Sequence, residues 1–431
     1  MSTAKHYAGM EVETPSFFGS PRRRRWQKLI CPVLAAAWLT GVSLALAEPV
    51  AVAETPGVRW TNGPWADSNF FPIGVWLQDP AKADQYRQAG INLYVGLWMG
   101  PTEEQLAALK EAGMWVICEQ TRIALQHLND TNIIGWMQKD EPDNGQSLGA
   151  RFGFGSPISP ETIIGDYRRM KALDASRPVL LDLGQAAAWD DWYGRGNRNH
   201  HPEDYPEYLK GCDIASFDIY PVNSENEAVS GKLWFVASGL ERLGQWSRGK
   251  KTVWNCVECT AITNPKKKPT PKQVRAEAWM SLIHGSRGLI YFVHQFKPKS
   301  NPAALLDDPE MLAAVTRLNQ QIMRLAPVLN SPAVQAVATV QLENTNVPVA
   351  AMIKHSGGAT YLFAVGMRDG ATKATFTLTG IEGNGLVEVL DENRTLTATN
   401  GSFSDHFDPW AVHLYRVPAT DQPPRVAAVK K

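Results

Sequence analysis

The sequence predicts an α/β protein, a (β/α)8 TIM barrel followed by a small C-terminal antiparallel β-sandwich. From Phe71 onward, short apolar runs rich in β-forming residues alternate with longer amphipathic segments, and eight such pairs end near Leu329. A stretch of about 260 residues is the usual size of a closed barrel. Beyond Leu329 the chain changes to short runs rich in Val, Thr and Phe, which glycine-containing turns interrupt.

The eight predicted strands are almost continuously apolar, as expected of parallel strands covered on both faces. An open doubly wound sheet is the alternative fold, but no glycine-rich phosphate loop follows the first strand, where Gly74 stands alone. The strands are expected at Phe71–Leu77, Ile91–Trp98, Met114–Glu119, Ile133–Lys139, Pro178–Leu183, Ile214–Ile219, Thr252–Val257 and Gly288–Val293.

Long helical segments lie between these strands. In Thr102–Ala112, Leu106 and Leu109 form an apolar stripe and Gly113 supplies the stop signal. Four more segments are long enough to cross back over a sheet: Pro160–Ala175, Lys232–Ser247, Pro271–Gly285 and Pro309–Leu325. The barrel is therefore assigned to residues 48–330 and the β-sandwich to 331–418, with a disordered tail at 419–431. The sandwich is expected to brace the barrel, with a carbohydrate-binding module as the alternative.

Residues 1–47 are predicted to be an export signal. A basic cluster, Arg22 to Arg25, precedes an apolar run from Leu29 to Ala47 whose last residues are small, which suits cleavage after Ala47. The cluster loosely resembles a twin-arginine signal, and Sec export is equally compatible. The mature protein is expected to be periplasmic or secreted, without stable membrane insertion. The alternative is an uncleaved N-terminal membrane anchor, because a run of about 19 apolar residues can just cross a bilayer.

The charge balance excludes a nucleic-acid partner. The chain has 43 basic and 43 acidic residues and no basic stripe of the kind that a phosphate backbone requires. The cysteines beyond the signal are Cys118, Cys212, Cys256 and Cys259. Inert buried thiols are expected first, and a Cys256–Cys259 disulfide is the second choice. Metal binding comes last, because no matching Cys or His pair lies nearby.

Two glutamates stand where predicted strands end. Glu141 follows the fourth strand and Glu258 follows the seventh. In a barrel of this type the active site lies at the carboxyl ends of the strands. Strands four and seven lie across the barrel from each other. Cleaving a glycosidic bond requires one carboxyl group to protonate the leaving oxygen and a second carboxylate to attack or to activate water. The two glutamates are therefore the candidate catalytic pair.

At these two positions the sequence resembles the clan A superfamily of retaining glycoside hydrolases on (β/α)8 barrels. The resemblance covers roughly Phe71 to Leu329 and implies Glu141 as the acid/base and Glu258 as the nucleophile. The common Asn-Glu-Pro signature appears here as Asp140, Glu141 and Pro142, so an acceptor replaces the side chain that usually donates to the sugar 2-hydroxyl. The superfamily also often keeps a tyrosine that hydrogen-bonds the nucleophile, a role that the resemblance gives to Tyr220.

Further polar and aromatic residues at the same rim are candidates for binding substrate. Aromatic rings beside hydrogen-bonding groups suit the faces and hydroxyls of pyranose rings. Packing is the alternative for the aromatic residues, and a satisfied structural histidine is the alternative for His294. The candidates are Trp98, Glu119, Asp140, Trp189, Trp192, Tyr193, Asp218, Tyr220, His294 and Gln295.

These observations predict a retaining glycoside hydrolase that acts on an oligo- or polysaccharide by double displacement, with no metal or organic cofactor. The first alternative is a catalytically inactive barrel protein that binds carbohydrate. The second is a metal-assisted hydrolase that uses Asp190, Asp191, His200 and His201, although their loop lacks a rigid ligand spacing.

Overall fold

The computed structural model describes residues 60–149, 151–332, 338–379 and 384–418. The predicted export signal and the predicted tail lie outside the described residues. Within the described part of the chain, no helix is both long and apolar enough to cross a membrane.

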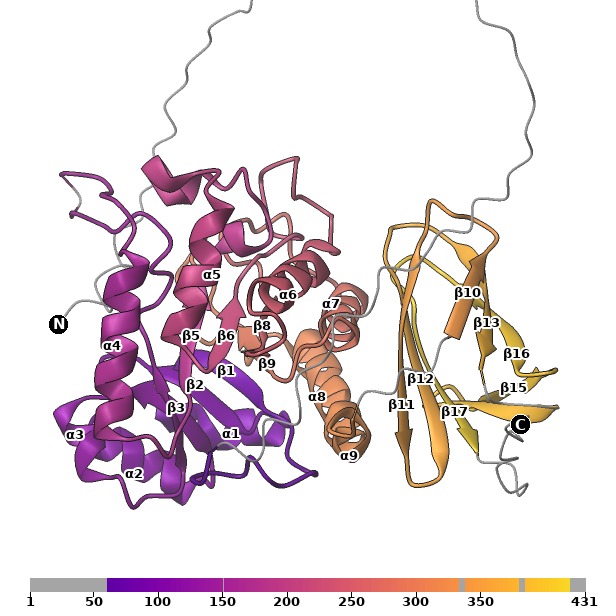
Figure 1. Ribbon diagram of the computed structural model, residues 1–431, viewed down its shortest axis with the longest axis horizontal. Helices are drawn as coiled ribbons and strands as arrows, with labels where there is room; N and C mark the ends of the chain where they lie inside the picture. Colours follow the sequence, from indigo (N-terminus) through magenta and orange to yellow (C-terminus); the bar gives the residue numbers. More distant parts are fainter. Residues whose placement is uncertain (1–59, 150, 333–337, 380–383, 419–431) are drawn as a thin grey trace, which may run out of the picture. The chain divides into compact units, whose positions relative to one another are not determined.

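The first part of the described chain is a parallel β-barrel surrounded by helices (Figure 1). Its strands are β1 (Ile73–Gln78), β2 (Leu93–Leu97), β3 (Trp115–Glu119), β4 (Ile133–Met137), β5 (Val179–Leu183), β6 (Ile214–Phe217), β7 (Thr252–Val253), β8 (Asn255–Glu258) and β9 (Leu289–Phe292). The sheet runs in the order β7-β6-β5-β4-β3-β2-β1-β9-β8. Only Trp254 separates β7 from β8, so both ends of the sheet belong to one interrupted strand. The barrel thus closes with eight strand positions, as predicted.

The helices of the barrel are α1 (Ala83–Gln88), α2 (Glu103–Glu111), α3 (Arg122–Gln126), α4 (Pro160–Leu173), α5 (Tyr205–Tyr208), α6 (Phe235–Trp246), α7 (Pro271–Ile283), α8 (Pro309–Arg324) and α9 (Ala326–Leu329). All five predicted helices are present. Side-chain caps fix several of their starts: Thr102 caps α2 and Thr270 caps α7, each in a reciprocal capping box with a glutamine. The short helices α1, α3, α5 and α9 were not predicted.

The inside of the barrel is filled by side chains. Trp76, Ile117, Leu180, Trp254 and Ile290 belong to one buried apolar cluster contributed by strands around the sheet. A packed interior is typical of this fold, whose active sites lie at the carboxyl ends of the strands.

The C-terminal part is the predicted β-sandwich. One sheet has the order β10-β13-β16, from β10 (Ala338–Leu342), β13 (Thr372–Leu378) and β16 (Ser402–Phe407). The other has the order β11-β12-β17-β14-β15, from β11 (Val349–Ser356), β12 (Ala359–Gly366), β17 (Val412–Pro418), β14 (Gly385–Val389) and β15 (Arg394–Ala398). Every strand pairing is antiparallel.

The barrel and the sandwich belong to one compact unit and share a hydrophobic core. The ring centroids of Trp279 on α7 and Phe363 on β12 are 5.1 Å apart. Lys354 on β11 donates from Nζ to the Ser331 carbonyl oxygen at 2.7 Å, and Arg324 on α8 forms an ion pair with Asp391. The apolar contact and the polar contacts together attach the sandwich to α7, α8 and α9.

Candidate active site

Acidic side chains gather at the carboxyl ends of β4, β5 and β6. Asp140 and Glu141 follow β4, Asp182 lies within β5, and Asp218 follows β6. The backbone of Glu141 has a φ of 38°, a left-handed conformation that is uncommon for a side-chain-bearing residue and makes the sharp turn before Pro142. Its N–H donates to the Asp182 carbonyl oxygen at 3.1 Å, which ties this turn to β5.

The carboxyl groups of Glu141 and Asp218 lie close enough that each shifts the pKa of the other, and both residues are partly exposed. The hydroxyl of Tyr220 also hydrogen-bonds Asp218. Sequence analysis proposed all three residues for the site, and the structure brings them together. The partner of Glu141, however, was expected to be Glu258.

Burial raises the pKa of Glu141 well above its ordinary range, and the nearby charges of Asp218, Asp140 and Asp143 raise it further. Burial and the charge of Asp182 also raise the pKa of Asp218, but its hydrogen bonds with Glu141 and Tyr220 act in the opposite direction. Two carboxyl groups so close together cannot both be ionised at little cost, so the pair shares a proton. A protonated carboxyl group beside a carboxylate is the arrangement needed for general acid catalysis.

Asp182 is a member of the cluster that sequence analysis missed. It is almost fully buried, accepts a hydrogen bond from the Ser216 hydroxyl, and lies 3.7 Å from the Cys256 sulfur. Burial and the charge of Asp140 raise its pKa well above the ordinary range. It was missed because a single acid inside the apolar run Val179–Leu183 carries no strand-end signal.

Glu258 has a different environment from the one expected of a nucleophile. Its side chain is fully buried, and its two oxygens accept hydrogen bonds from the N–H groups of Val222 at 2.6 Å and Asn223 at 2.8 Å. It also hydrogen-bonds the carboxyl group of Glu277 on α7. The groups that shift the pKa of Glu141 do not include Glu258. The loop after β6 thus covers Glu258, and the pairing of Glu141 with Glu258 stays a prediction.

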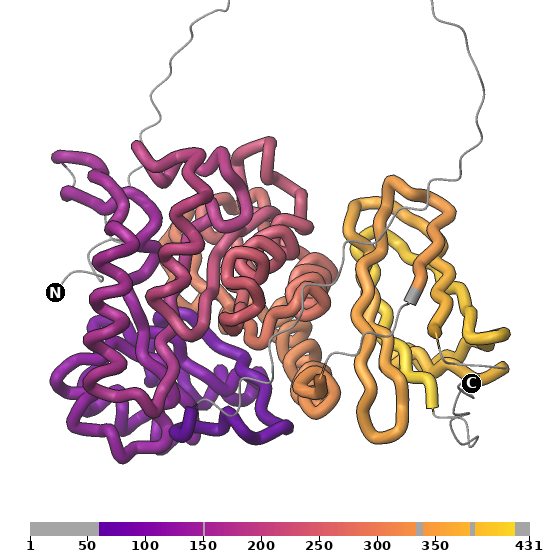
Figure 2. Tube along the Cα trace, viewed as in Figure 1, coloured from indigo at the N-terminus to yellow at the C-terminus, as the bar shows by residue number. Residues whose placement is uncertain are grey.

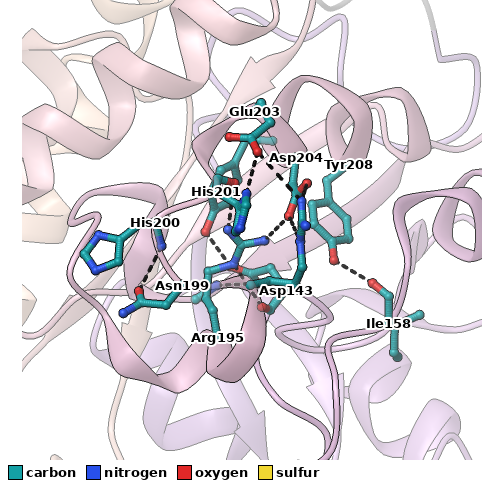
Figure 3. A network of polar contacts seen from close by, with 12 residues as sticks. Asp143, Ile158, Arg195, Asn199, His200, His201, Glu203, Asp204 and Tyr208 are labelled. Carbon is teal, nitrogen blue, oxygen red and sulfur yellow. Dashed lines mark hydrogen bonds and ion pairs between the residues drawn. The ribbon is translucent and has the colours of Figure 1, made fainter.

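A second polar network fixes the loops after β4 and β5 (Figure 3). The fully buried Asp143 accepts hydrogen bonds from the Gly184 N–H at 2.9 Å and the Tyr205 hydroxyl at 2.8 Å. Arg195, also buried, donates to the Asp143 carbonyl oxygen at 3.2 Å, the His201 carbonyl oxygen at 2.8 Å and the Asp204 carboxylate at 2.6 Å. These contacts hold the backbone that follows Glu141 in place.

The aromatic candidates are in different environments. Trp189 is 8% exposed and packs in the barrel core, whereas Tyr193 is 70% exposed. Trp192 lies between them, its ring centroid 4.7 Å from that of Tyr193, and its indole N–H donates to Asn144. Trp98, after β2, is 36% exposed. Of the four, Trp98 and Tyr193 have the ring surface most available to a ligand.

The insert after β4 lies beside this aromatic loop. Its Gly145 N–H donates to the Gly194 carbonyl oxygen at 2.7 Å, and Ser156 accepts from the Asn197 amide at 3.2 Å. In Figure 2 the insert projects beyond the N-terminal end of α4. Phe152 and Phe154 in the insert are strongly exposed. The sequence analysis did not single out these rings.

Three other predicted residues lie outside the carboxyl cluster. His294 is buried, its Nε2 lies 3.0 Å from Gln78 Nε2 and 3.1 Å from the Trp76 carbonyl oxygen, and burial lowers its pKa. This is the environment of a structural histidine. Gln295 pairs through its backbone with Ile262 and Asn301. Glu119, at the end of β3, is exposed.

The loop proposed for a metal does not gather its ligands. His200 pairs with Asp191, His201 pairs with Glu203, and Asp190 pairs with Arg242. Within the described residues, no three His, Cys, Asp or Glu side chains are placed to hold one metal ion. Cys118, Cys212, Cys256 and Cys259 are all buried free thiols, as expected first, and the alternative Cys256–Cys259 disulfide is absent from the described chain.

The solved structures that are similar to this chain include AmyP and two α-amylases. A structure of AmyP in complex with maltose has a TM-score of 0.51 at 10% identity, covering 83% of this chain and 98% of that one. The α-amylase from Geobacillus thermoleovorans complexed with acarbose gives 0.52 at 12% identity, with 82% and 99% covered. An Anoxybacillus α-amylase gives 0.51 at 10%, with 83% and 99% covered.

Comparison with protein-family models gives no match. Comparison with curated protein sequences gives none either. At 10 to 12% identity the structural likeness concerns the fold alone. The chain therefore has the same fold as these glycoside hydrolases, a (β/α)8 barrel followed by a β-rich module.

Proposed function

We propose that the protein is a glycoside hydrolase whose reacting carboxyl groups are Glu141 and Asp218. The observation that carries this proposal is the close pair of carboxyl groups that the two side chains form at the carboxyl ends of β4 and β6. Both residues are partly exposed, and one carboxyl oxygen of Asp218 is buried. The fold shared with α-amylases makes a glycan the first substrate class to test.

In the proposed reaction, Glu141 protonates the glycosidic oxygen as the bond to the anomeric carbon breaks. Asp218 attacks that carbon and forms a glycosyl ester, while the Tyr220 hydroxyl holds its other oxygen. Glu141, now ionised, then takes a proton from a water molecule that attacks the same carbon and releases Asp218. The raised pKa of Glu141 suits the first step, because the acid must still carry its proton when substrate binds.

The direct contact between Glu141 and Asp218 favours retention of configuration. An inverting enzyme separates its two carboxyl groups by about 6.5 to 9.5 Å to accommodate a water molecule, whereas a retaining enzyme keeps them about 5 to 5.5 Å apart. Two carboxyl groups that interact this closely fit the shorter separation better than the longer one. We therefore retain double displacement as the proposed mechanism and replace Glu258 with Asp218 as the nucleophile.

The test is turnover on a panel of aryl α- and β-glycosides and soluble polysaccharides, with proton NMR to follow the anomeric configuration of the first product. We expect Glu141→Gln to lower kcat by about 10²- to 10⁴-fold on natural glycosides. Its loss should be smaller on aryl glycosides, whose leaving groups need little protonation. Asp218→Asn should lose turnover on both. Glu111→Gln, an exposed residue at the end of α2, is the matched control.

Two outcomes would contradict the proposal. Glycan binding without any product across the panel would favour a carbohydrate-binding barrel without catalysis. Full turnover by Asp218→Asn, together with inactive Glu258→Gln, would return the nucleophile to Glu258. Inversion at the anomeric carbon would reject double displacement but would leave Glu141 as the acid.

A further inference from the structure

The loop after β6, residues 218–231, carries two members of the candidate site, Asp218 and Tyr220, and it rests on a buried carboxylate. Successive N–H groups of this loop, from Val222 and Asn223, donate to the two oxygens of Glu258 at 2.6 and 2.8 Å. A carboxylate that accepts two backbone donors fixes the position and orientation of that backbone. Glu258 therefore acts on the site through the loop above it.

Glu277 completes the arrangement from α7. It is fully buried, and within the described chain neither of its oxygens receives a hydrogen bond from an N–H or hydroxyl group. The contact that remains is with the carboxyl group of Glu258. Two buried carboxyl groups in contact cannot both be ionised at a tolerable free energy, so they must share a proton. Both backbone donors point at Glu258, which places the charge there and the proton on Glu277.

Asn223 extends the same attachment to the loop after β8. Its side-chain nitrogen donates to the carbonyl oxygens of Ala261 at 2.6 Å and Lys267 at 3.1 Å, and its side-chain oxygen accepts from the Thr263 N–H at 3.0 Å. Lys267 in turn donates from Nζ to the Ser224 carbonyl oxygen at 2.8 Å. Hydrogen bonds thus attach the loop after β6 both to the Glu258 carboxylate and to residues 261–267.

We propose that Glu258 and Glu277 are positioning residues: a buried carboxyl pair that shares one proton and holds the loop bearing Asp218 and Tyr220 against Glu141. The attachment of the loop stands on the contacts above, and only its consequence for turnover rests on the proposed function. In this proposal the pair positions the reacting carboxylate. The sequence pattern had predicted that Glu258 is itself the reacting carboxylate.

Few other titratable groups of the described chain lie near the pair, so we expect its shared proton to account for the pH dependence. Cys259 lies near the pair, and the charges of Glu258 and Glu277 raise the pKa of its thiol. The charge of Asp308 also raises this pKa, and that of Lys268 lowers it. Asp308 and Lys268 form an ion pair with each other. Burial raises the pKa of Glu277 well above its ordinary range. Burial also raises the pKa of Glu258, where the N–H groups of Val222 and Asn223 act in the opposite direction.

The test compares the wild-type protein with Glu277→Gln, Glu258→Gln and the control Glu111→Gln. Glu277→Gln keeps a neutral donor toward Glu258 and removes the titrating proton. Because the folded wild-type pair retains a proton that the unfolded chain releases above about pH 4.5, wild-type Tm should fall between pH 5 and 8, by roughly 2 °C per pH unit per proton. Glu277→Gln should flatten this slope while amide exchange in residues 218–231 stays slow.

Glu258→Gln should speed amide exchange in residues 218–231, because an amide presents only one acceptor to two N–H donors. On an active wild-type enzyme it should lower kcat, with partial activity and unchanged product configuration. An unchanged pH slope in Glu277→Gln, or wild-type exchange in Glu258→Gln, would overturn the proposal. So would recovery of an inactive Glu258→Ala by azide, which marks a nucleophile. The exchange and Tm readouts need no substrate, so a failure of the glycosidase proposal would remain distinguishable.

Discussion

The network around Asp204 offers two arginines that bind the same carboxylate at different depths. The Arg195 side chain is 1% exposed and that of Arg198 is 39% exposed, and both donate to Asp204. Arg195 also donates to two backbone carbonyl oxygens and lies over the Tyr205 ring, 5.0 Å from its centroid. Replacing each arginine with methionine removes the charge and keeps much of the apolar stem.

The two substitutions should differ strongly in cost. Arg195→Met leaves the carbonyl groups of Asp143 and His201 without their donor and removes one buried partner of Asp204. The expected destabilisation is about 3 to 5 kcal/mol, the usual cost of breaking a buried ion pair from one side. Arg198→Met removes an exposed partner, for which about 1 kcal/mol or less is expected. The two variants should therefore differ in free energy of unfolding by at least about 2 kcal/mol. Such a difference would show that burial, more than ion-pair geometry, determines how much each arginine stabilises the fold.

Urea unfolding followed by tryptophan fluorescence measures the difference, because Trp189 and Trp192 report from the same loop. The midpoint for Arg195→Met should fall well below that of Arg198→Met, with a similar slope for both. Equal midpoints would refute the reasoning, since they would mean that the buried carbonyl groups find other donors. A changed slope for only one variant would show that it unfolds in more than one step.

Two further substitutions test the site and the junction with the sandwich. Tyr220→Phe removes the hydroxyl that hydrogen-bonds Asp218, so the pKa of Asp218 should rise, the acidic limb of the kcat/KM profile should move to higher pH, and turnover should fall roughly fivefold. An unshifted limb would contradict the assigned contact. Burial lowers the pKa of Lys354 to about 7, below its value of about 10.4 in an unfolded chain, so Tm should rise as the pH increases from about 7 to 10. Lys354→Met should lose that rise, and a rise that persists in the variant would assign it to another group.

The barrel could be predicted because strands covered on both faces leave a continuous apolar signature, which the eight runs displayed. Glu141 was found because it follows such a run. Glu258 has the same signal, but a strand pattern does not reveal that Val222 and Asn223 fold over its carboxylate. The sequence pattern predicts where a strand ends. What the last residue of that strand contacts depends on the loop after a neighbouring strand, here the loop after β6.

Glu277 was hidden for another physical reason. A helix on the outside of a barrel normally shows one polar face, but Ala276 to Leu282 of α7 are all buried because the sandwich covers the outer side. An acid in such a helix looks like part of a solvent-exposed stripe until the covering module is placed. Asp182 and Ser216 were likewise concealed within apolar strands.

The common core of the two modules limits how this protein can be divided or rearranged. Trp279 on α7 packs against Phe363 of the sandwich. A chain ending after α9 would therefore expose a large hydrophobic surface and would be prone to aggregate. A recombined gene that encodes one module without the other would produce a protein with the same exposed hydrophobic surface. The barrel and the sandwich are therefore expected to have diverged as a single heritable block, with residues on α7 and β12 changing in concert.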